Sequence, residues 1–241
     1  MKFKRLLKYI YFLLFIVGLG FLYSFSSNRN GARKTSNPII EFEQSNANFL
    51  SYSIVNKLLI QKNDSAENLA KSVIDLYGLE SLISKNPYVE KATVFLTVEG
   101  QLKSRIKQRD PIARIVSATE SYYVDKQGVK VPLSKNYSAR VLLVSGINNQ
   151  QDITEIMPLL SKIVEDNFLQ KEIVGVQKKE ENEYEFAVRS GTYKIDFGKL
   201  SEMDIKFKKL KAFYVKTFED KSIQMYKTIN VKYKNQVVCT K

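Results

Sequence analysis

The feature that most constrains this chain is an uncharged run of twenty residues near its N-terminus, Tyr9–Asn28. At about 1.5 Å of rise per residue it would form about 30 Å of helix, which is enough to cross the hydrocarbon core of a bilayer. Tyr9, Tyr11 and Tyr23 lie near its ends, as aromatic side chains do at membrane–water interfaces. The run therefore predicts a transmembrane helix at 9–28 that contacts membrane lipid.

Two alternatives to an anchor are a cleaved signal peptide and a buried core helix. A signal peptide has an apolar region of about 7–15 residues that ends at an A-x-A-like site. The run here is longer and no such site follows it. Four basic residues precede the span and three follow it closely, so the charge asymmetry that orients a span is slight. We expect residues 1–8 to form a cytoplasmic head, because so short a segment is easily retained in the cytoplasm. The bulk of the chain is expected to be exported.

The charge distribution argues against a nucleic-acid partner. The net charge is +13, but residues 35–198 carry 20 basic and 21 acidic residues and are nearly neutral. Residues 199–241 carry 11 basic and 4 acidic residues, a net charge of +7. DNA binding requires an extended basic surface, and this segment would lie across the membrane.

The residue inventory excludes several chemistries. The chain has no His and its single Cys is Cys239, which removes intrachain disulfides, Cys/His zinc sites and an imidazole base. Ser104-Arg-Ile-Lys107 matches the S-x-x-K pattern of a Ser/Lys hydrolase, but residues i and i+3 of a strand face opposite sides. The acidic run at 180–183 is interpreted as a solvated loop. We expect no catalytic, cofactor-binding or metal-binding residues and no enzyme activity, and we interpret Cys239 as a small apolar strand residue.

Residues 29–37 are polar and non-periodic and are expected to form a linker. Apolar and polar residues then alternate over Val89–Val98 and Gln101–Arg109, on either side of Glu99-Gly100, which predicts a hairpin with one buried face. Together with the upstream elements it makes a β-α-α-β-β module at 38–110. Those upstream elements are a strand at Pro38–Phe42 and helices at Ser51–Leu59 and Leu76–Lys85.

Residues 111–241 predict a mostly antiparallel β domain with two helices, so the chain as a whole is α+β. Asp152-Ile-Thr-Glu155 has the form of a capping box at the start of the first helix, and Pro158 predicts a kink or a late start there. Ser201 is expected to cap the second helix, whose apolar residues extend from Met203 to Phe218. The expected strands are Ile112–Val116, Tyr122–Asp125, Val129–Leu133, Arg140–Val144, Ile173–Gln177, Tyr184–Arg189, Thr192–Phe197, Tyr226–Tyr233 and Gln236–Cys239.

Five short motifs follow one another along the chain. Pro87–Val94 resembles P-[WY]-V-x-x-A-x-V, and Gln108–Ala113 resembles E-R-x-P-x-A, with Gln in place of the acid. Residues 124–128, 141–146 and 229–233 resemble V-D-x-x-G, P-x-L-x-G and I-D-L-R-Y. In this order the motifs resemble those of the FtsQ/DivIB family of cell-division proteins, in which the first lies in a POTRA module and the last is terminal.

The resemblance implies a single-pass protein of the plasma (inner) membrane that acts at the division septum. It implies a POTRA domain at 38–110, a β domain at 111–241, and a non-catalytic scaffold that binds FtsB-like and FtsL-like bitopic proteins. It also implies a role in controlling the septal synthases FtsW and FtsI, with no cofactor. The alternative is a POTRA-bearing secretion or outer-membrane assembly factor.

The terminal strand is the expected partner-binding site. An edge strand with free N–H and C=O groups accepts an added strand, and neighbouring side chains anchor it. Basic residues around it favour an acidic partner segment. The alternative is that this strand only completes the core. The expected partner-binding residues are Tyr233, Asn235, Gln236, Val237 and Val238.

The predicted topology has a direct test. A reporter that is active only outside the cytoplasm, fused after Lys241, is expected to be active, because the only predicted span leaves the C-terminus exported. A second fusion with a reporter that works only in the cytoplasm should be silent. Activity of this second fusion would reverse the orientation.

Overall fold

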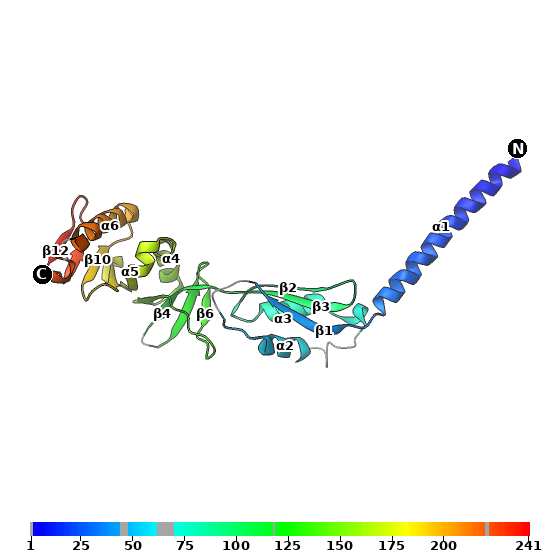
Figure 1. Cartoon of the computed structure of the whole chain (residues 1–241), viewed down its shortest axis with the longest axis horizontal. Helices are drawn as coiled ribbons and strands as arrows, with labels where there is room; N and C mark the ends of the chain where they lie inside the picture. The colour runs from blue at the N-terminus through cyan, green and yellow to red at the C-terminus, as the bar shows by residue number, and fades with distance from the viewer. Residues whose placement is uncertain (1, 44–47, 62–69, 118, 220–221) are drawn as a thin grey trace. The chain divides into compact units, whose positions relative to one another are not determined.

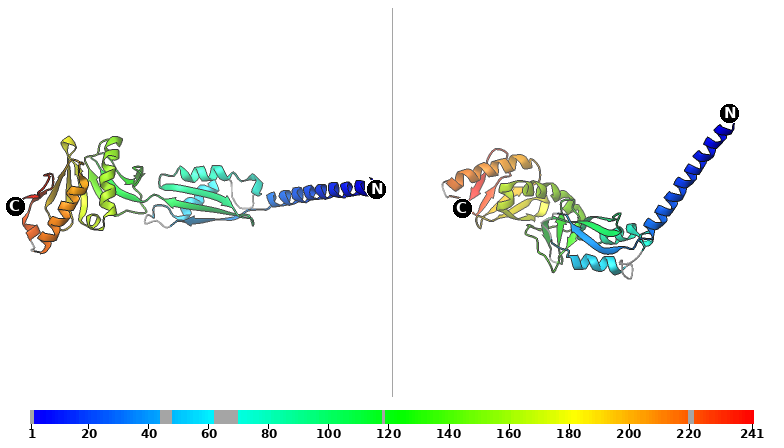
Figure 2. Two further views of the ribbon diagram at one scale, coloured as in Figure 1. Left: turned by 90° about the horizontal axis from the view of Figure 1, so that it is seen from above. Right: turned by 45° about the vertical axis from the view of Figure 1, so that its right-hand side comes forward.

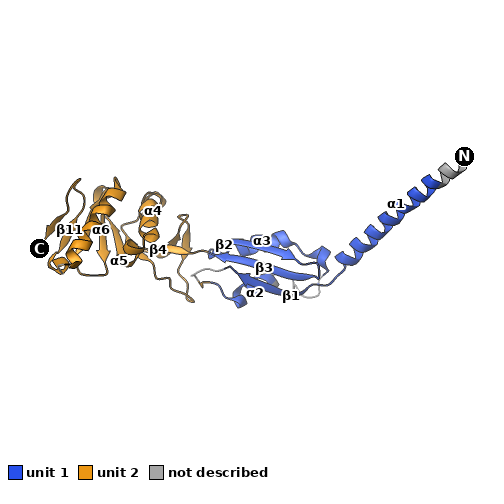
Figure 3. Cartoon of the chain, turned by 45° about the horizontal axis from the view of Figure 1, so that its top comes forward, with its two compact units in different colours: residues 1–44, 50–108 blue, residues 45–49, 109–241 orange. Residues whose placement is uncertain are grey.

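A computed structural model describes residues 2–43, 48–61, 70–117, 119–219 and 222–241 (Figure 1). Met1 of the predicted cytoplasmic head lies outside the described residues. The chain divides into two compact units (Figure 3). Unit 1 comprises 1–44 and 50–108, and unit 2 comprises 45–49 and 109–241.

The first helix, α1 (Lys2–Gly31), contains the predicted span. Its segment Lys8–Gly31 is long and apolar enough to cross a membrane, and none of its most apolar window is buried. A helix that is apolar on all sides and covered by no protein is suited to lipid. It is the one such helix in the described part of the chain. The helix extends into the predicted linker, 29–37, and the next strand already begins at Ser36.

Unit 1 has the predicted β-α-α-β-β order. Its three strands form a sheet in the order β1-β3-β2, with β1 parallel to β3 and β2 antiparallel to β3. Both helices pack on one face, where Val55 and Leu79 join Val94 and Ile106 in the core. The elements are β1 (Ser36–Phe42), α2 (Tyr52–Gln61), the 3-10 turn η1 (Lys71–Val73), α3 (Leu76–Ser84), β2 (Val89–Leu96) and β3 (Gln101–Gln108).

Ser104 lies in this core and is fully buried on β3, opposite Val94 and Ile40 of the neighbouring strands. Its Oγ has no hydrogen-bond partner among the described residues. Lys107 lies on the other face, where its Nζ is 2.8 Å from Oε1 of Glu90. The two residues of the S-x-x-K pattern therefore point to opposite sides of the sheet.

Ser104→Ala is expected to raise the free energy of unfolding by about 1 kcal/mol, because it removes a buried hydroxyl that makes no hydrogen bond. Urea denaturation of the detergent-solubilised chain measures this change. The matched control is Ser36→Ala on β1, whose side chain is exposed and whose replacement should change stability by less than about 0.5 kcal/mol. Destabilisation by Ser104→Ala would indicate that the hydroxyl has a partner.

Unit 2 is built on a nine-stranded sheet in the order β12-β11-β10-β9-β8-β7-β4-β5-β6. Its pairs are antiparallel except β4–β7, β7–β8 and β10–β11, which are parallel. The predicted α+β class is confirmed. The strands are β4 (Pro111–Val116), β5 (Ser121–Asp125), β6 (Lys130–Pro132), β7 (Leu142–Ser145), β8 (Ile173–Lys178), β9 (Tyr184–Val188), β10 (Lys194–Gly198), β11 (Thr228–Asn230) and β12 (Val238–Thr240).

Three α-helices occur in the described part of unit 2, one more than predicted: α4 (Gln150–Glu165), α5 (Asn167–Glu172) and α6 (Met203–Glu219). The predicted cap of α4 was placed too late. Asn149 is the N-cap, and its side chain accepts a hydrogen bond from Asp152 N. Asp152 instead accepts from Asn148 N at 2.8 Å and pairs with Lys178 Nζ at 2.6 Å. Pro158 lies inside α4, so the late start is wrong.

Helix α6 lies against one face of the sheet (Figure 2). Phe207 stacks near Phe186 and Phe197, with ring centroids 6.3 and 4.9 Å away. Lys206 is buried on the same helix, donates from Nζ to Lys199 O at 2.6 Å and lies 5.0 Å from the Phe197 ring centroid. Burial lowers its pKa. The apolar spacing predicted this helix, but it did not predict a lysine on the buried side.

A buried carboxylate fixes α6 to the rest of unit 2. Glu172, the last residue of α5, is 8% exposed, and its Oε1 accepts hydrogen bonds from Ser190 and from Tyr214 Oη. Tyr193 Oη donates to Tyr214 Oη at 2.9 Å. Burial raises the pKa of both tyrosines, which keeps them protonated as donors. The network joins α5, the β9–β10 connection and α6.

Three of the resembling motifs have structural roles. Arg109 Nη1 lies 2.6 Å from Oδ2 of Asp125. This ion pair joins the motif at Gln108–Ala113 to the motif at 124–128. Oδ1 of Asp125 accepts from Gln127 N and Val129 N, both at 2.9 Å, which closes the turn after β5. Gly146 has a φ of +79°, and a Cβ there would lie 2.1 Å from Lys178 O. These residues build the fold.

Candidate interaction site at the terminal sheet edge

The C-terminal edge of the unit 2 sheet is created by a crossover. β10 and β11 run parallel, with Ile195 paired to Ile229, so the chain must return to the starting end of β10 before β11. α6 and the 3-10 turn η3 (Ser222–Met225) form this return. β12 then pairs antiparallel with β11, with Ile229 opposite Cys239, and lies at the end of the strand order.

The terminal strand begins two residues later than predicted, at Val238 instead of Gln236. Val237 and Cys239 are partly buried and pack against the core, and burial raises the pKa of the Cys239 thiol. Val238, between them, is 38% exposed. Val237, which directly precedes the strand, and Cys239 thus face the core, and Val238 faces solvent.

The other expected partner-binding residues lie in the β11–β12 connection. Tyr233 is 51% exposed, and Asn235 and Gln236 are also exposed. All three precede β12 in the chain and none belongs to a strand. The structure therefore places the predicted residues on one hairpin, with four of them exposed and Val237 turned inward.

Two lysines hold this connection in place. Lys209 of α6 donates from Nζ to Val231 O at 3.0 Å and to Tyr233 O. Lys232 Nζ lies 2.9 Å from Asp196 Oδ2 and 3.1 Å from Glu183 Oε2. The hydrogen bond with Asp196 is the main reason that the pKa of Lys232 is raised. Lys209 was not predicted, because nothing in its helical position indicates contact with carbonyls 22 and 24 residues away.

Acidic side chains on this part of the sheet are already paired with lysines. Glu185 binds Lys194 at 2.8 Å and also Lys179, while Glu183 and Asp196 share Lys232. The predicted loop at 180–183 contains the 3-10 turn η2 (Glu180–Asn182). Within the described residues, no group of three or more His, Cys, Asp or Glu side chains is placed to hold a metal ion.

Cations without a carboxylate partner surround the hairpin. Lys227, Lys234 and Lys241 are exposed, and none of them makes an ion pair with another described residue. The backbone of Lys227 is well held, since its N–H donates to Thr240 O at 2.8 Å. The edge is therefore basic and short, with one apolar side chain exposed on the strand.

In the described residues, one apolar helix that can span a membrane is followed by a small β-α-α-β-β unit and a mixed sheet that ends at β12. This arrangement defines an α+β protein with one candidate span. The chain belongs to the FtsQ/DivIB, C-terminal related family, whose model matches residues 110–240. The resemblance inferred from the five motifs is confirmed, and the chain is a division-associated protein. No curated protein matches it.

Lys209→Ala is expected to loosen the β11–β12 connection, because two carbonyls lose a charged donor, at a cost of about 1 kcal/mol. Amide exchange of Val238–Thr240 should become faster and the thermal midpoint should fall. Lys208→Ala is the matched control, since it is exposed on the same helix and makes the same change in helix propensity. Equal exchange in the two variants would contradict a role for Lys209.

Proposed function

We propose that the chain is a non-catalytic, single-span scaffold of the division machinery. In this proposal residues 1–8 are cytoplasmic, α1 crosses the plasma membrane, and both units are exported and act at the septum. The apolar α1 and the family membership support it. The buried Ser104 and the lysine-paired carboxylates of the sheet fit a role in binding rather than catalysis.

We propose that unit 1 is a POTRA module at about residues 38–110 and that the β domain occupies 111–241. The β-α-α-β-β order and the parallel β1–β3 pair support this assignment. The strand boundaries at Ser36 and Gln108 and the division of the compact units at Arg109 lie close to these limits.

The position of β12 at the free end of the nine-stranded sheet is the observation that carries the binding proposal. One side of an edge strand offers unpaired N–H and C=O groups to an incoming chain. β12 has only three residues, a length that limits self-association and leaves room for a partner to add a strand. Val238, the first residue of β12, faces solvent, and Tyr233 supplies an exposed ring in the same hairpin.

The partner segment that fits this edge is acidic. Lys227, Lys234 and Lys241 lie around it without carboxylate partners in the described part of the chain, and residues 199–241 carry a net charge of +7. Such a field speeds encounter with an acidic segment and weakens in high salt. By the family resemblance, the partners are FtsB-like and FtsL-like bitopic proteins, through which the chain would help control FtsW and FtsI.

Two proline variants test strand addition. Successive N–H groups of a strand point alternately to its two sides. Of the two variants Val238→Pro and Cys239→Pro, one therefore removes an N–H group that points outward, and the other removes an N–H group that donates to β11. The outward variant should bind an FtsB-like partner from the same organism at least tenfold more weakly, about 1.4 kcal/mol, with a nearly unchanged thermal midpoint. The other variant should lower the thermal midpoint. Titration with a labelled partner measures affinity.

The two variants are each other's control, because they make the same substitution one residue apart. Tyr233→Ala adds a side-chain test and should weaken binding without unfolding the hairpin. If both proline variants keep the wild-type affinity while the domain remains folded, β12 only completes the core and strand addition is wrong.

A further inference from the structure

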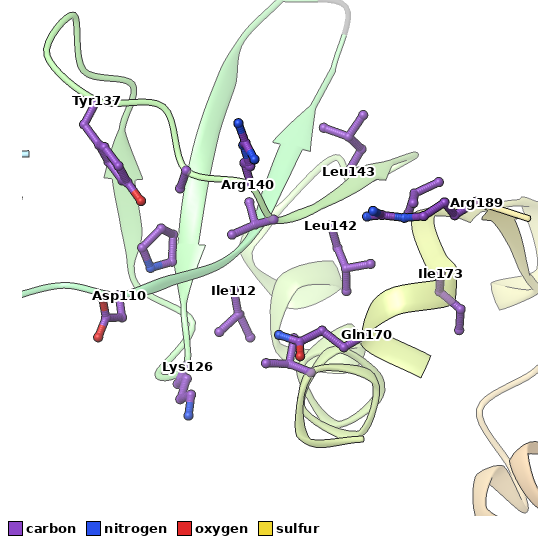
Figure 4. A pocket seen from close by; sticks show the side chains of 15 residues that line it. Asp110, Ile112, Lys126, Tyr137, Arg140, Leu142, Leu143, Gln170, Ile173 and Arg189 are labelled. Carbon is purple, nitrogen blue, oxygen red and sulfur yellow. The ribbon is translucent and has the colours of Figure 1, made fainter. Parts of the chain in front are cut away.

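A groove of about 660 Å³ lies in unit 2 where the neighbouring parallel strands β4, β7 and β8 begin (Figure 4). The first residues of these strands line it with apolar side chains, among them Ile112, Leu142 and Ile173. Leu143 is 52% exposed next to them. The volume is in the range of pockets that hold drug-sized ligands, about 300–1,000 Å³, and it accommodates a few side chains of a peptide.

Three cations line the same groove from different loops. Lys126 follows β5, Arg140 precedes β7 and Arg189 follows β9. All three are exposed, and their side chains form no ion pair or hydrogen bond with another described residue. Asp110 is the one acid among the described lining residues. The groove therefore combines an apolar floor with a net positive rim.

The cations that line the groove differ from Arg109, which forms an ion pair within the fold. Arg109 is held 2.6 Å from the buried Asp125 and also donates to Gln127, so its charge is used by the fold. Arg140 and Arg189 come from positions 49 residues apart in the chain and line one groove, and neither has a carboxylate partner in the described part of the chain. Guanidinium groups bind carboxylates through two parallel hydrogen bonds, so two of them beside an apolar floor suit acidic side chains that flank an apolar one.

We propose that this groove binds a short acidic segment of a partner protein, with an apolar side chain on the floor and carboxylates on Arg140 and Arg189. An apolar ligand alone would leave the cations without partners. The site is separate from β12, because β9, β10 and β11 lie between β8 and β12 in the sheet. A failure of strand addition at β12 would therefore not count against binding at the groove.

Selection from a library of random dodecapeptides tests the proposal, with the full chain carrying Val238→Pro and Cys239→Pro held in lipid nanodiscs. Enriched peptides should carry net negative charge and apolar residues. Measured by fluorescence anisotropy with the otherwise wild-type chain, their affinity should fall at least tenfold when Arg140→Gln and Arg189→Gln are combined. The thermal midpoint should not change, because both side chains are exposed and unpaired.

Lys135→Gln and Lys216→Gln, combined, form the matched control. They remove the same charge from exposed positions that do not line the groove, and affinity should fall less than threefold. Enrichment of neutral or basic peptides, recovery of no peptide, or equal binding by the arginine variant would overturn the proposal. Equally tight, arginine-dependent binding of a twelve-nucleotide oligothymidine would also overturn it, since the groove would then select phosphate rather than acidic peptide.

Discussion

The arrangement of unit 2 depends on the buried carboxylate of Glu172. A carboxylate removed from water is costly unless hydrogen bonds replace its hydration. Here hydroxyl groups of Ser190 and Tyr214 supply those bonds, and Tyr193 supports Tyr214. Because the donors come from the β9–β10 connection and from α6, the network fixes the crossover helix against the sheet. The parallel β10–β11 pair, and with it the terminal edge, follows from the position of this helix.

Local patterns in the sequence predicted most elements of the fold. The alternation of Leu102, Ser104 and Ile106 predicted a buried face of β3, and the structure buries all three. The helix predicted at Leu76–Lys85 is α3, which begins at Leu76 and ends at Ser84. Helix α5 was missed because its six residues are too few to show a period. The start of β12 was placed too early because the adjacent Val237 and Val238 are equally apolar, although only one of them is in the strand.

Contacts between distant residues could not be predicted in the same way. The parallel pairs β4–β7 and β7–β8 join segments separated by other elements, and no local pattern reports them. The same is true of Lys209 and of the groove that brings Arg140 and Arg189 together. For the candidate site, the sequence indicated the hairpin and its basic character. It did not reveal which side chain would turn inward, since that depends on register with β11.

The long crossover between β10 and β11 also bears on the order in which unit 2 folds. Pairing of strands that are far apart in the chain is slow, because loop closure must precede the contacts that reward it. We therefore expect β11 to join the sheet after α6 has docked, and β12, which pairs with β11, to join with it or later. The edge proposed for partner binding is then the last part of the sheet to assemble. A chain in which Glu172 and Tyr214 have not met would lack that edge, so recruitment of a partner would be confined to molecules that have completed folding.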